Sequence, residues 1–188
     1  MTPHVAQSDE DLAALAGHGD RSAFERLVGR HKASLFNFVR RYVGQADDAY
    51  DVLQDTFLAA WLAAPRFNPE RPFLPWLRTI ALNKCRDFGR RRSVRRLLFS
   101  TSSDVKETHN PENTETAEAN AESDRLSRLD QAIAALPRAY KEPLLLTSVS
   151  GLSHQEAAAV LQTTAKAIEM RVYRAKRQLM EMMKESRE

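Results

Sequence analysis

The last part of the chain carries the clearest alternation of apolar and polar positions. Four apolar residues in it follow helical spacing: Ile168, Val172, Ala175 and Leu179. Separations of 4, 3 and 4 residues place them on one stripe of a helix. Upstream, Ser153 and Glu156 form a capping box, the pattern that opens a helix. This order of short helix, tight turn and longer helix predicts a helix-turn-helix.

The face of the longer helix opposite this stripe is polar and mostly basic. The residues on it or beside it are Lys166, Glu169, Met170, Arg171, Tyr173, Arg174, Lys176 and Arg177. Lysine and arginine suit phosphates, and side chains near the start of such a helix can reach base edges in the major groove. The pattern therefore favours DNA binding over the alternative, a charge-rich helix that is exposed to solvent at the end of a small bundle.

Three positions in this segment depart from the usual pattern. Gln162 stands in the turn, where a left-handed backbone favours glycine. Thr163 follows it, at a position where an apolar residue is expected. Pro143 falls inside the preceding helical pattern. Because proline lacks an N–H group, we expect a kink there.

Helical spacing also runs through the first half of the chain. The predicted elements are a short helix that begins near Ser8 and long helices over about 20–43, 48–64 and 74–98. A loop stiffened by three prolines separates the last two helices. His31, Trp76 and Cys85 lie on apolar stripes of these helices. We therefore expect them to be core or boundary residues.

Charge is strongly segregated along the 188 residues, although the net charge is only +3. Residues 83–100 carry seven Lys and Arg and one Asp, whereas residues 101–124 carry seven acids and one Lys. The acidic stretch has almost no large apolar residue and cannot bury a core. The sequence therefore predicts an all-α protein with two small helical domains, at residues 1–98 and 125–188, joined by a flexible, disordered acidic linker at 99–124.

Composition argues against several other classes of protein. The single cysteine, Cys85, excludes an internal disulfide and fits a reducing cytosol. The N-terminus lacks an apolar signal run, and no stretch approaches a membrane span. No histidines or cysteines have metal-ligand spacing, and no glycine-rich phosphate loop occurs. We therefore expect a cytoplasmic protein with no metal, cofactor, small-molecule substrate or direct membrane insertion.

Two blocks of the sequence carry a family resemblance. The first block consists of Asp48–Trp61 and Pro72–Asp87. The second consists of Leu136–Pro137, Gly151–Ser153, Glu156–Ala158 and Arg171–Lys176. In this order, with a variable linker between them, the blocks resemble region 2 and region 4 of the extracytoplasmic-function (ECF, group 4) sigma factors, which belong to the sigma-70 family of bacterial RNA polymerase.

The resemblance to region 2 implies two binding surfaces on the N-terminal domain. Asp51, Gln54 and Asp55 match the acidic helix that docks on core RNA polymerase. A second set matches the part that opens and reads the −10 element of promoter DNA: Phe67, Asn68, Arg71, Asn83, Lys84, Arg86 and Arg90. On this match the N-terminal domain would contact both the polymerase and the promoter.

The resemblance to region 4 implies that the last helix reads the −35 element. The residues that would face bases are Glu169, Met170 and Tyr173, with Lys166 on the same exposed face, and those that would face phosphates are Arg171, Arg174 and Lys176. The linker would run toward the active-site and RNA-exit channel of the polymerase. The family also implies a dedicated anti-sigma factor, often anchored in the membrane, that would hold this chain inactive.

Two other functions are compatible with the sequence. A stand-alone helix-turn-helix regulator would use its N-terminal domain to sense a ligand or to dimerise. A thiol enzyme would combine Cys85 with His31, but the apolar stripe around Cys85 favours a structural cysteine. The two basic surfaces and the acidic tether favour a transcription initiation factor, which is not an enzyme.

Overall fold

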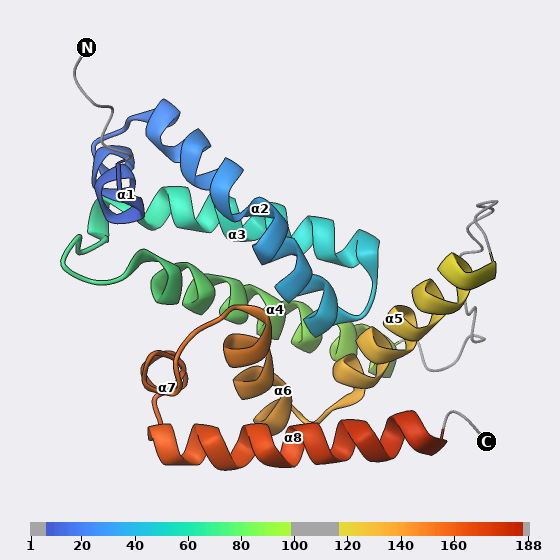
Figure 1. The fold of residues 1–188 in the computed structure, drawn as a ribbon. Coiled ribbons are helices and arrows are strands. Elements are labelled where there is room, and N and C mark those ends of the chain that lie inside the picture. Colours follow the sequence, from blue (N-terminus) through green and yellow to red (C-terminus); the bar gives the residue numbers. More distant parts are fainter. Residues whose placement is uncertain (1–6, 99–116, 186–188) are drawn as a thin grey trace.

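The computed structural model describes residues 7–98 and 117–185 of the chain, and every regular element within these ranges is helical (Figure 1). The α-helices are α1 (Asp9–Gly17), α2 (Arg21–Val43), α3 (Ala46–Ala63), α4 (Phe73–Leu98), α5 (Ala117–Ala135), α6 (Arg138–Leu144), α7 (His154–Leu161) and α8 (Ala165–Glu185). A 3-10 turn, η1 (Ala64–Arg66), follows α3, and a π-helical turn, η2 (Leu145–Val149), follows α6. The prediction of an all-α protein is confirmed.

Capping residues determine where the first helices begin and end. Ser8 Oγ accepts a hydrogen bond from the Asp11 N–H, and the Asp11 carboxylate accepts one from the Ser8 N–H, both at 3.1 Å. Asp20 caps α2 by accepting the Ala23 N–H at 3.1 Å. Gly44 ends α2 with a φ of 87°, a left-handed conformation that glycine adopts without strain. Helix α2 therefore lies within one residue of its predicted bounds.

Helices α1–α4 form an N-terminal module in which α2 contacts α1, α3 and α4. Their apolar stripes meet in a core that includes Leu35, Phe38, Val52 and Leu77, all at most 3% exposed. Burying each of these side chains stabilises the fold by about 1.5–3 kcal/mol. Cys85 is also fully buried, so its predicted core position is confirmed.

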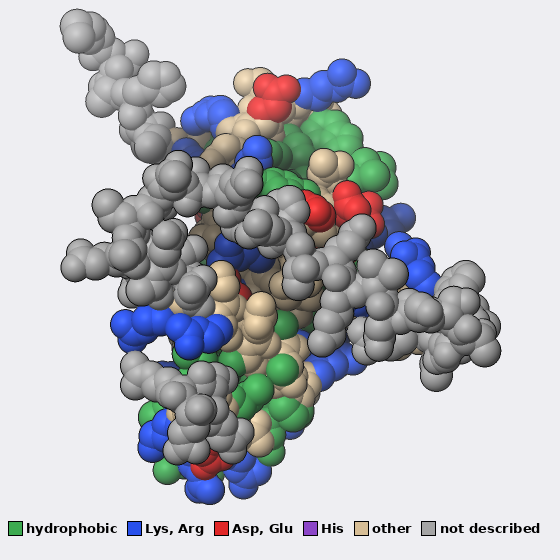
Figure 2. All heavy atoms as spheres, turned by 90° about the vertical axis from the view of Figure 1, so that its right-hand side faces the viewer, with side chains coloured by type: hydrophobic (Ala, Val, Ile, Leu, Met, Phe, Trp, Pro, Cys, Tyr) green, Lys and Arg blue, Asp and Glu red, His purple; other side chains and the backbone are tan. Residues whose placement is uncertain are grey.

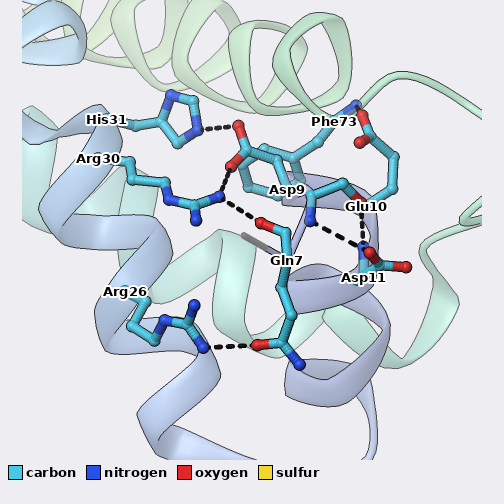
Figure 3. Close-up of polar contacts among 9 residues, drawn as sticks. Gln7, Asp9, Glu10, Asp11, Arg26, Arg30, His31 and Phe73 are labelled. Carbon is cyan, nitrogen blue, oxygen red and sulfur yellow. Dashed lines mark hydrogen bonds and ion pairs between the residues drawn. The ribbon is translucent and has the colours of Figure 1, made fainter. Parts of the chain in front are cut away.

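A polar cluster joins α1 to α2 and α4 (Figure 3). Asp9 accepts from the ring of His31 and from Arg30, both at 2.6 Å. Burial raises the pKa of Asp9, but the hydrogen bonds from Arg30 and His31 outweigh it and leave the pKa below its usual value. Glu10 accepts the Phe73 N–H at 2.9 Å. His31 is thus a boundary histidine with a satisfied ring, as predicted.

Helices α5–α8 form a C-terminal module in which α8 contacts α5, α6 and α7. Helix α6 continues through Pro143 to Leu144, and the chain then changes to the π turn η2 at Leu145. The hydroxyl of Thr147 donates to the carbonyl of Pro143 at 2.9 Å. The helix type therefore changes shortly after this proline, and the kink expected at Pro143 stays a prediction.

The helix-turn-helix is formed by α7 and α8. Ser153 Oγ accepts the Glu156 N–H at 3.2 Å and the Glu156 carboxylate accepts the Ser153 N–H at 2.8 Å, so the predicted capping box is confirmed. The buried stripe of α8 is also confirmed, because Ile168, Val172 and Ala175 are at most 7% exposed. The chain turns between the two helices at Gln162.

Gln162 has a φ of 52°, which makes it the one non-glycine residue with a positive φ in the described part of the chain. A left-handed conformation costs an L-residue about 1–2 kcal/mol. We therefore expect Gln162→Gly to stabilise the protein by about 0.5–1 kcal/mol, or about 1–4 °C in Tm. The matched control is Gln155→Gly on the exposed side of α7, which should lower stability by about 1 kcal/mol. A drop in Tm for both variants would mean that Gln162 is not strained.

The two modules pack against each other in this structure. α5 contacts α2, and α7 contacts α4, so that buried residues of both modules form one continuous cluster (Figure 1). The approach is close where α2 ends, because a Cβ on Gly44 would lie 3.0 Å from the Cβ of Ala134. Helix α5 begins at Ala117, within the range predicted as linker, while residues 99–116 of that linker lie outside the described residues.

Candidate functional site

The exposed face of α3 carries the residues predicted to dock on the polymerase. Asp51, Gln54 and Asp55 are all exposed, while Val52 and Leu53 between them are buried. Leu58 and Leu62, further along the helix, are 58% and 70% exposed. The structure therefore brings the three predicted residues together on one surface and continues that surface with large apolar side chains.

A groove of about 680 Å³ separates this acidic face from the basic end of α4. Its far wall includes Lys84, Arg91, Arg92 and Arg95. Arg92 reaches across to Asp48 at 3.4 Å, in a half-exposed pair that contributes little stability. Lys84, predicted to contact the −10 element, thus lies in the same groove as the predicted docking residues.

The loop before α4 carries three residues predicted to contact the −10 element, but it presents only two of them. Asn68 and Arg71 are exposed, and the turn is held by the Glu70 N–H, which donates to the side chain of Asn68 at 3.0 Å. Phe67 is 9% exposed, with its ring 5.8 Å from that of Phe73 and 5.0 Å from that of Trp76. In this structure Phe67 therefore contributes to the core.

This loop lies against the C-terminal module. A second groove of about 680 Å³ has Phe67, Asn68, Arg71 and Trp76 on one side, and Glu156, Ala159 and Val160 of α7 on the other. Nucleic acid that reached Asn68 and Arg71 would therefore have to share this space with α7.

The remaining residues predicted to contact the −10 element lie along α4, where Arg86 Nη1 donates to the Asn83 side chain at 3.4 Å. Asn83 and Arg90 are exposed, and Arg90 pairs with Asp87 of the same helix. Arg86 points instead to the C-terminal module, where its Nη2 lies 2.6 Å from the Glu142 carboxylate and its Nε 2.9 Å. Arg86 is therefore already bound to an anion in this structure.

Helix α8 presents its predicted polar face to solvent. The exposed residues are Lys166, Glu169, Met170, Tyr173, Arg174 and Lys176, while Arg171 is half-buried. Lys166 pairs with Glu169 at 2.8 Å, and this hydrogen bond lowers the pKa of Glu169. On the face drawn in Figure 2, Lys and Arg side chains lie over both modules. The predicted residues of α8 thus share one accessible face, opposite the buried stripe.

Ion pairs between the modules are a feature that sequence reasoning missed. Arg40 and Arg41 of α2 both bind Asp130 of α5, the second with an Nε–Oδ1 distance of 3.0 Å. Glu142 accepts from Arg86, and also from the Tyr42 hydroxyl at 3.0 Å. Burial raises the pKa of Glu142, but the hydrogen bond and charge of Arg86, and the nearby Arg138, hold it below the usual value.

The thiol hypothesis finds no support in the geometry. Burial raises the pKa of Cys85, which is the opposite of what an activated thiolate needs. The ring of His31 is bonded to Asp9 instead. Among the described residues no group of three or more His, Cys, Asp or Glu is arranged to hold a metal ion, and no helix is long and apolar enough to span a membrane.

The fold and its surfaces define a helix-turn-helix DNA-binding protein with an additional helical module. Comparison with known families narrows this class. Residues 27–95 match the model of Sigma-70 region 2, and residues 126–179 match that of Sigma-70, region 4. The RNA polymerase sigma factor NccH of Alcaligenes xylosoxydans xylosoxydans is 39% identical over 179 residues, covering 95% of this chain and 96% of its own.

The chain belongs to the sigma-70 family of RNA polymerase sigma factors. CnrH of Cupriavidus metallidurans is likewise 39% identical, and 95% of each chain is covered. The solved structure of CnrH with the cytosolic domain of CnrY matches with a TM-score of 0.70 at 34% identity, over 95% of this chain and 98% of that one. The function is that of an alternative sigma factor, which confirms the principal hypothesis over a stand-alone regulator.

Proposed function

We propose that this chain docks on core RNA polymerase through the exposed acidic face of α3 and directs the enzyme to promoters through both modules. Asp51, Gln54 and Asp55 are the proposed docking residues. This assignment is supported by the exposure of all three side chains on one face of the helix. Their oxygens can accept charge-assisted hydrogen bonds from basic groups of a partner. The exposed Leu58 and Leu62 would add apolar contact area at the same interface.

The observation that carries the promoter assignment is the division of α8 into a buried stripe and an exposed polar face. Met170 and Tyr173 on that face are 41% and 63% exposed, so both side chains are accessible to a partner. We assign Glu169, Met170 and Tyr173, with Lys166, to the bases of a −35 element. We assign Arg171, Arg174 and Lys176 to its phosphates, since lysine and arginine are among the side chains that bind phosphate oxygens.

The −10 assignment covers the loop before α4 and α4 itself. Asn68, Arg71, Asn83, Lys84, Arg86 and Arg90 are the proposed contacts. Phe67 is included on condition that the loop rearranges, because its ring now packs against Phe73 and Trp76. A positively charged groove that follows the strand backbone, combined with aromatic side chains on which bases stack, is the usual means of binding single-stranded DNA.

We further propose that the protein acts in the cytoplasm and is held inactive by an anti-sigma factor, which would tether it to the membrane if that partner is anchored there. The support is the solved complex of its relative CnrH with the cytosolic domain of CnrY. The chain itself is proposed to have no catalytic activity, since the polymerase supplies the chemistry.

Substitution of Glu169 tests the assignment of α8 to the −35 element. A carboxylate can accept a hydrogen bond from the N4 amino group of cytosine, and a lost base contact costs about 1–3 kcal/mol at one position. We expect Glu169→Ala to relax base preference at one −35 position, measured as holoenzyme affinity for a set of −35 variants. Arg174→Ala should instead weaken all variants and reduce the salt slope by about one.

Glu181→Ala is the matched control, because Glu181 is an exposed acid on the same helix that pairs with Arg177 at 3.3 Å. It should leave base preference unchanged. Equal loss of affinity on every −35 variant after Glu169→Ala would contradict the assignment of Glu169 to a base.

A further inference from the structure

Two carboxylates and three arginines form ion pairs that hold the two modules together. Asp130 of α5 binds Arg40 and Arg41 of α2, and Glu142 of α6 binds Arg86 of α4. Both carboxylates are almost fully buried, with Asp130 7% and Glu142 5% exposed. We use the name inter-module latch for Asp130, Glu142 and the three arginines that they bind in the N-terminal module, Arg40, Arg41 and Arg86.

The geometry of the latch resembles the way in which arginine binds phosphate. Arg86 donates from two different nitrogens to the two oxygens of Glu142, at 2.9 and 2.6 Å. Such paired N–H···O bonds are the arrangement by which arginine recognises carboxylates and phosphates alike. While Glu142 occupies Arg86, a nucleic-acid phosphate cannot use the same donors.

The packed modules affect the proposed surfaces unequally. α7 closes one side of the groove that contains Asn68 and Arg71, and Glu142 occupies Arg86. Asp55 on α3 and Tyr173 on α8 stay exposed. The packed arrangement therefore covers −10 contacts and leaves the proposed polymerase dock and the −35 face accessible.

We propose that Asp130 and Glu142 form an autoinhibitory latch, in which Glu142 stands in for a DNA phosphate on Arg86 and keeps the −10 surface closed until the modules separate. Because the polymerase dock stays exposed, the closed chain can bind the polymerase first and open afterwards. This inference rests on the proposed assignment of Arg86 to −10 DNA.

A ligand that binds only the open chain has an apparent affinity reduced in proportion to the fraction of open molecules. Removing both latch carboxylates would leave Arg40, Arg41 and Arg86 without their anions at the interface, which disfavours closure. Removing the carboxylates should therefore raise the fraction of open molecules, and the affinity for single-stranded DNA should rise with it.

The test compares the full-length chain with the double variant Asp130→Asn/Glu142→Gln. Small-angle X-ray scattering should give the wild type a radius of gyration near that of a compact chain of this length, about 16 Å. The double variant should have a clearly larger value. Its affinity for a fluorescent oligothymidine single strand should rise about tenfold.

The control is Glu25→Gln/Glu181→Gln, which removes one exposed carboxylate from each module and so makes the same change in net charge. It should leave the radius of gyration unchanged and raise affinity only slightly. If the double latch variant does not fold, as judged by circular dichroism, Asp130→Asn alone serves as the test, because it leaves the Arg86–Glu142 pair in place and should give a smaller opening.

Two outcomes separate this inference from the function on which it rests. A latch variant as compact as the wild type would overturn the latch, whatever its affinity for DNA. A variant that opens but gains no affinity, or whose gain survives the further change Arg86→Ala, would overturn the assignment of Arg86 to DNA and with it the autoinhibitory role of Glu142.

Discussion

Asp55→Arg is expected to lower the affinity of the chain for core RNA polymerase at least tenfold while its thermal unfolding stays nearly unchanged. Asp55 is exposed on α3 beside Gln54, one helical turn from Asp51. An exposed acid tolerates reversal within about 0.5 kcal/mol of stability. At an interface with basic groups, reversal brings like charges together and costs several kcal/mol of binding.

The affinity can be measured by titrating labelled chain with core polymerase, and Tm by circular dichroism. Glu25→Arg is a suitable control, because Glu25 is an exposed acid on α2, outside the proposed dock. Core binding at wild-type strength after Asp55→Arg would exclude this face as the dock. Loss of folding would show that Asp55 is structural, and the support for docking would then be the family resemblance.

The predictable part of this molecule is the part that depends on local pattern. The stripe of Ile168, Val172 and Ala175 determined which face of α8 is buried, because a 3.6-residue period leaves one solution. The capping box at Ser153 placed the start of α7 for a similar reason, since the side chains that satisfy the first N–H groups lie within three residues. The exposure of Asp51 and Asp55 followed in the same way.

Contacts between distant segments could not be predicted. Arg78 reads as a basic residue on a helix, yet it is 1% exposed, donates to Ser34 at 3.0 Å and lies 5.2 Å from the ring of Phe38. Burial lowers its pKa to about 10, so it stays charged at neutral pH. Glu142 likewise stands between a lysine and a proline, without a pattern that indicates a buried acid.

The position of Phe67 shows a limit of residue-by-residue transfer from a family. The resemblance assigned Phe67 to DNA together with Asn68 and Arg71, because the three share one loop. The loop exposes the two polar residues and turns the ring inward, since burying a phenylalanine against Phe73 and Trp76 is favourable. Sequence proximity placed these residues in one loop but could not determine which of them face solvent.

The isolated chain should bind promoter duplex weakly, and the holoenzyme should bind it tightly. Each module offers only a small basic surface, and the net charge of the chain is only +3. When core polymerase fixes both modules on one scaffold, binding at one element raises the effective concentration of the other module at its own element, which can increase affinity by about a hundredfold or more. Opening of the latch would act in the same direction.

The most direct measurement is therefore a comparison of chain and holoenzyme on the same DNA. Promoter sequences would first be selected from a random library with reconstituted holoenzyme, and affinities then measured by fluorescence anisotropy at physiological salt. We expect tight, sequence-specific binding by the holoenzyme and binding at least about a hundredfold weaker by the chain alone. Nanomolar, sequence-specific binding by the isolated chain, not improved by core polymerase, would contradict this account and indicate a stand-alone helix-turn-helix regulator.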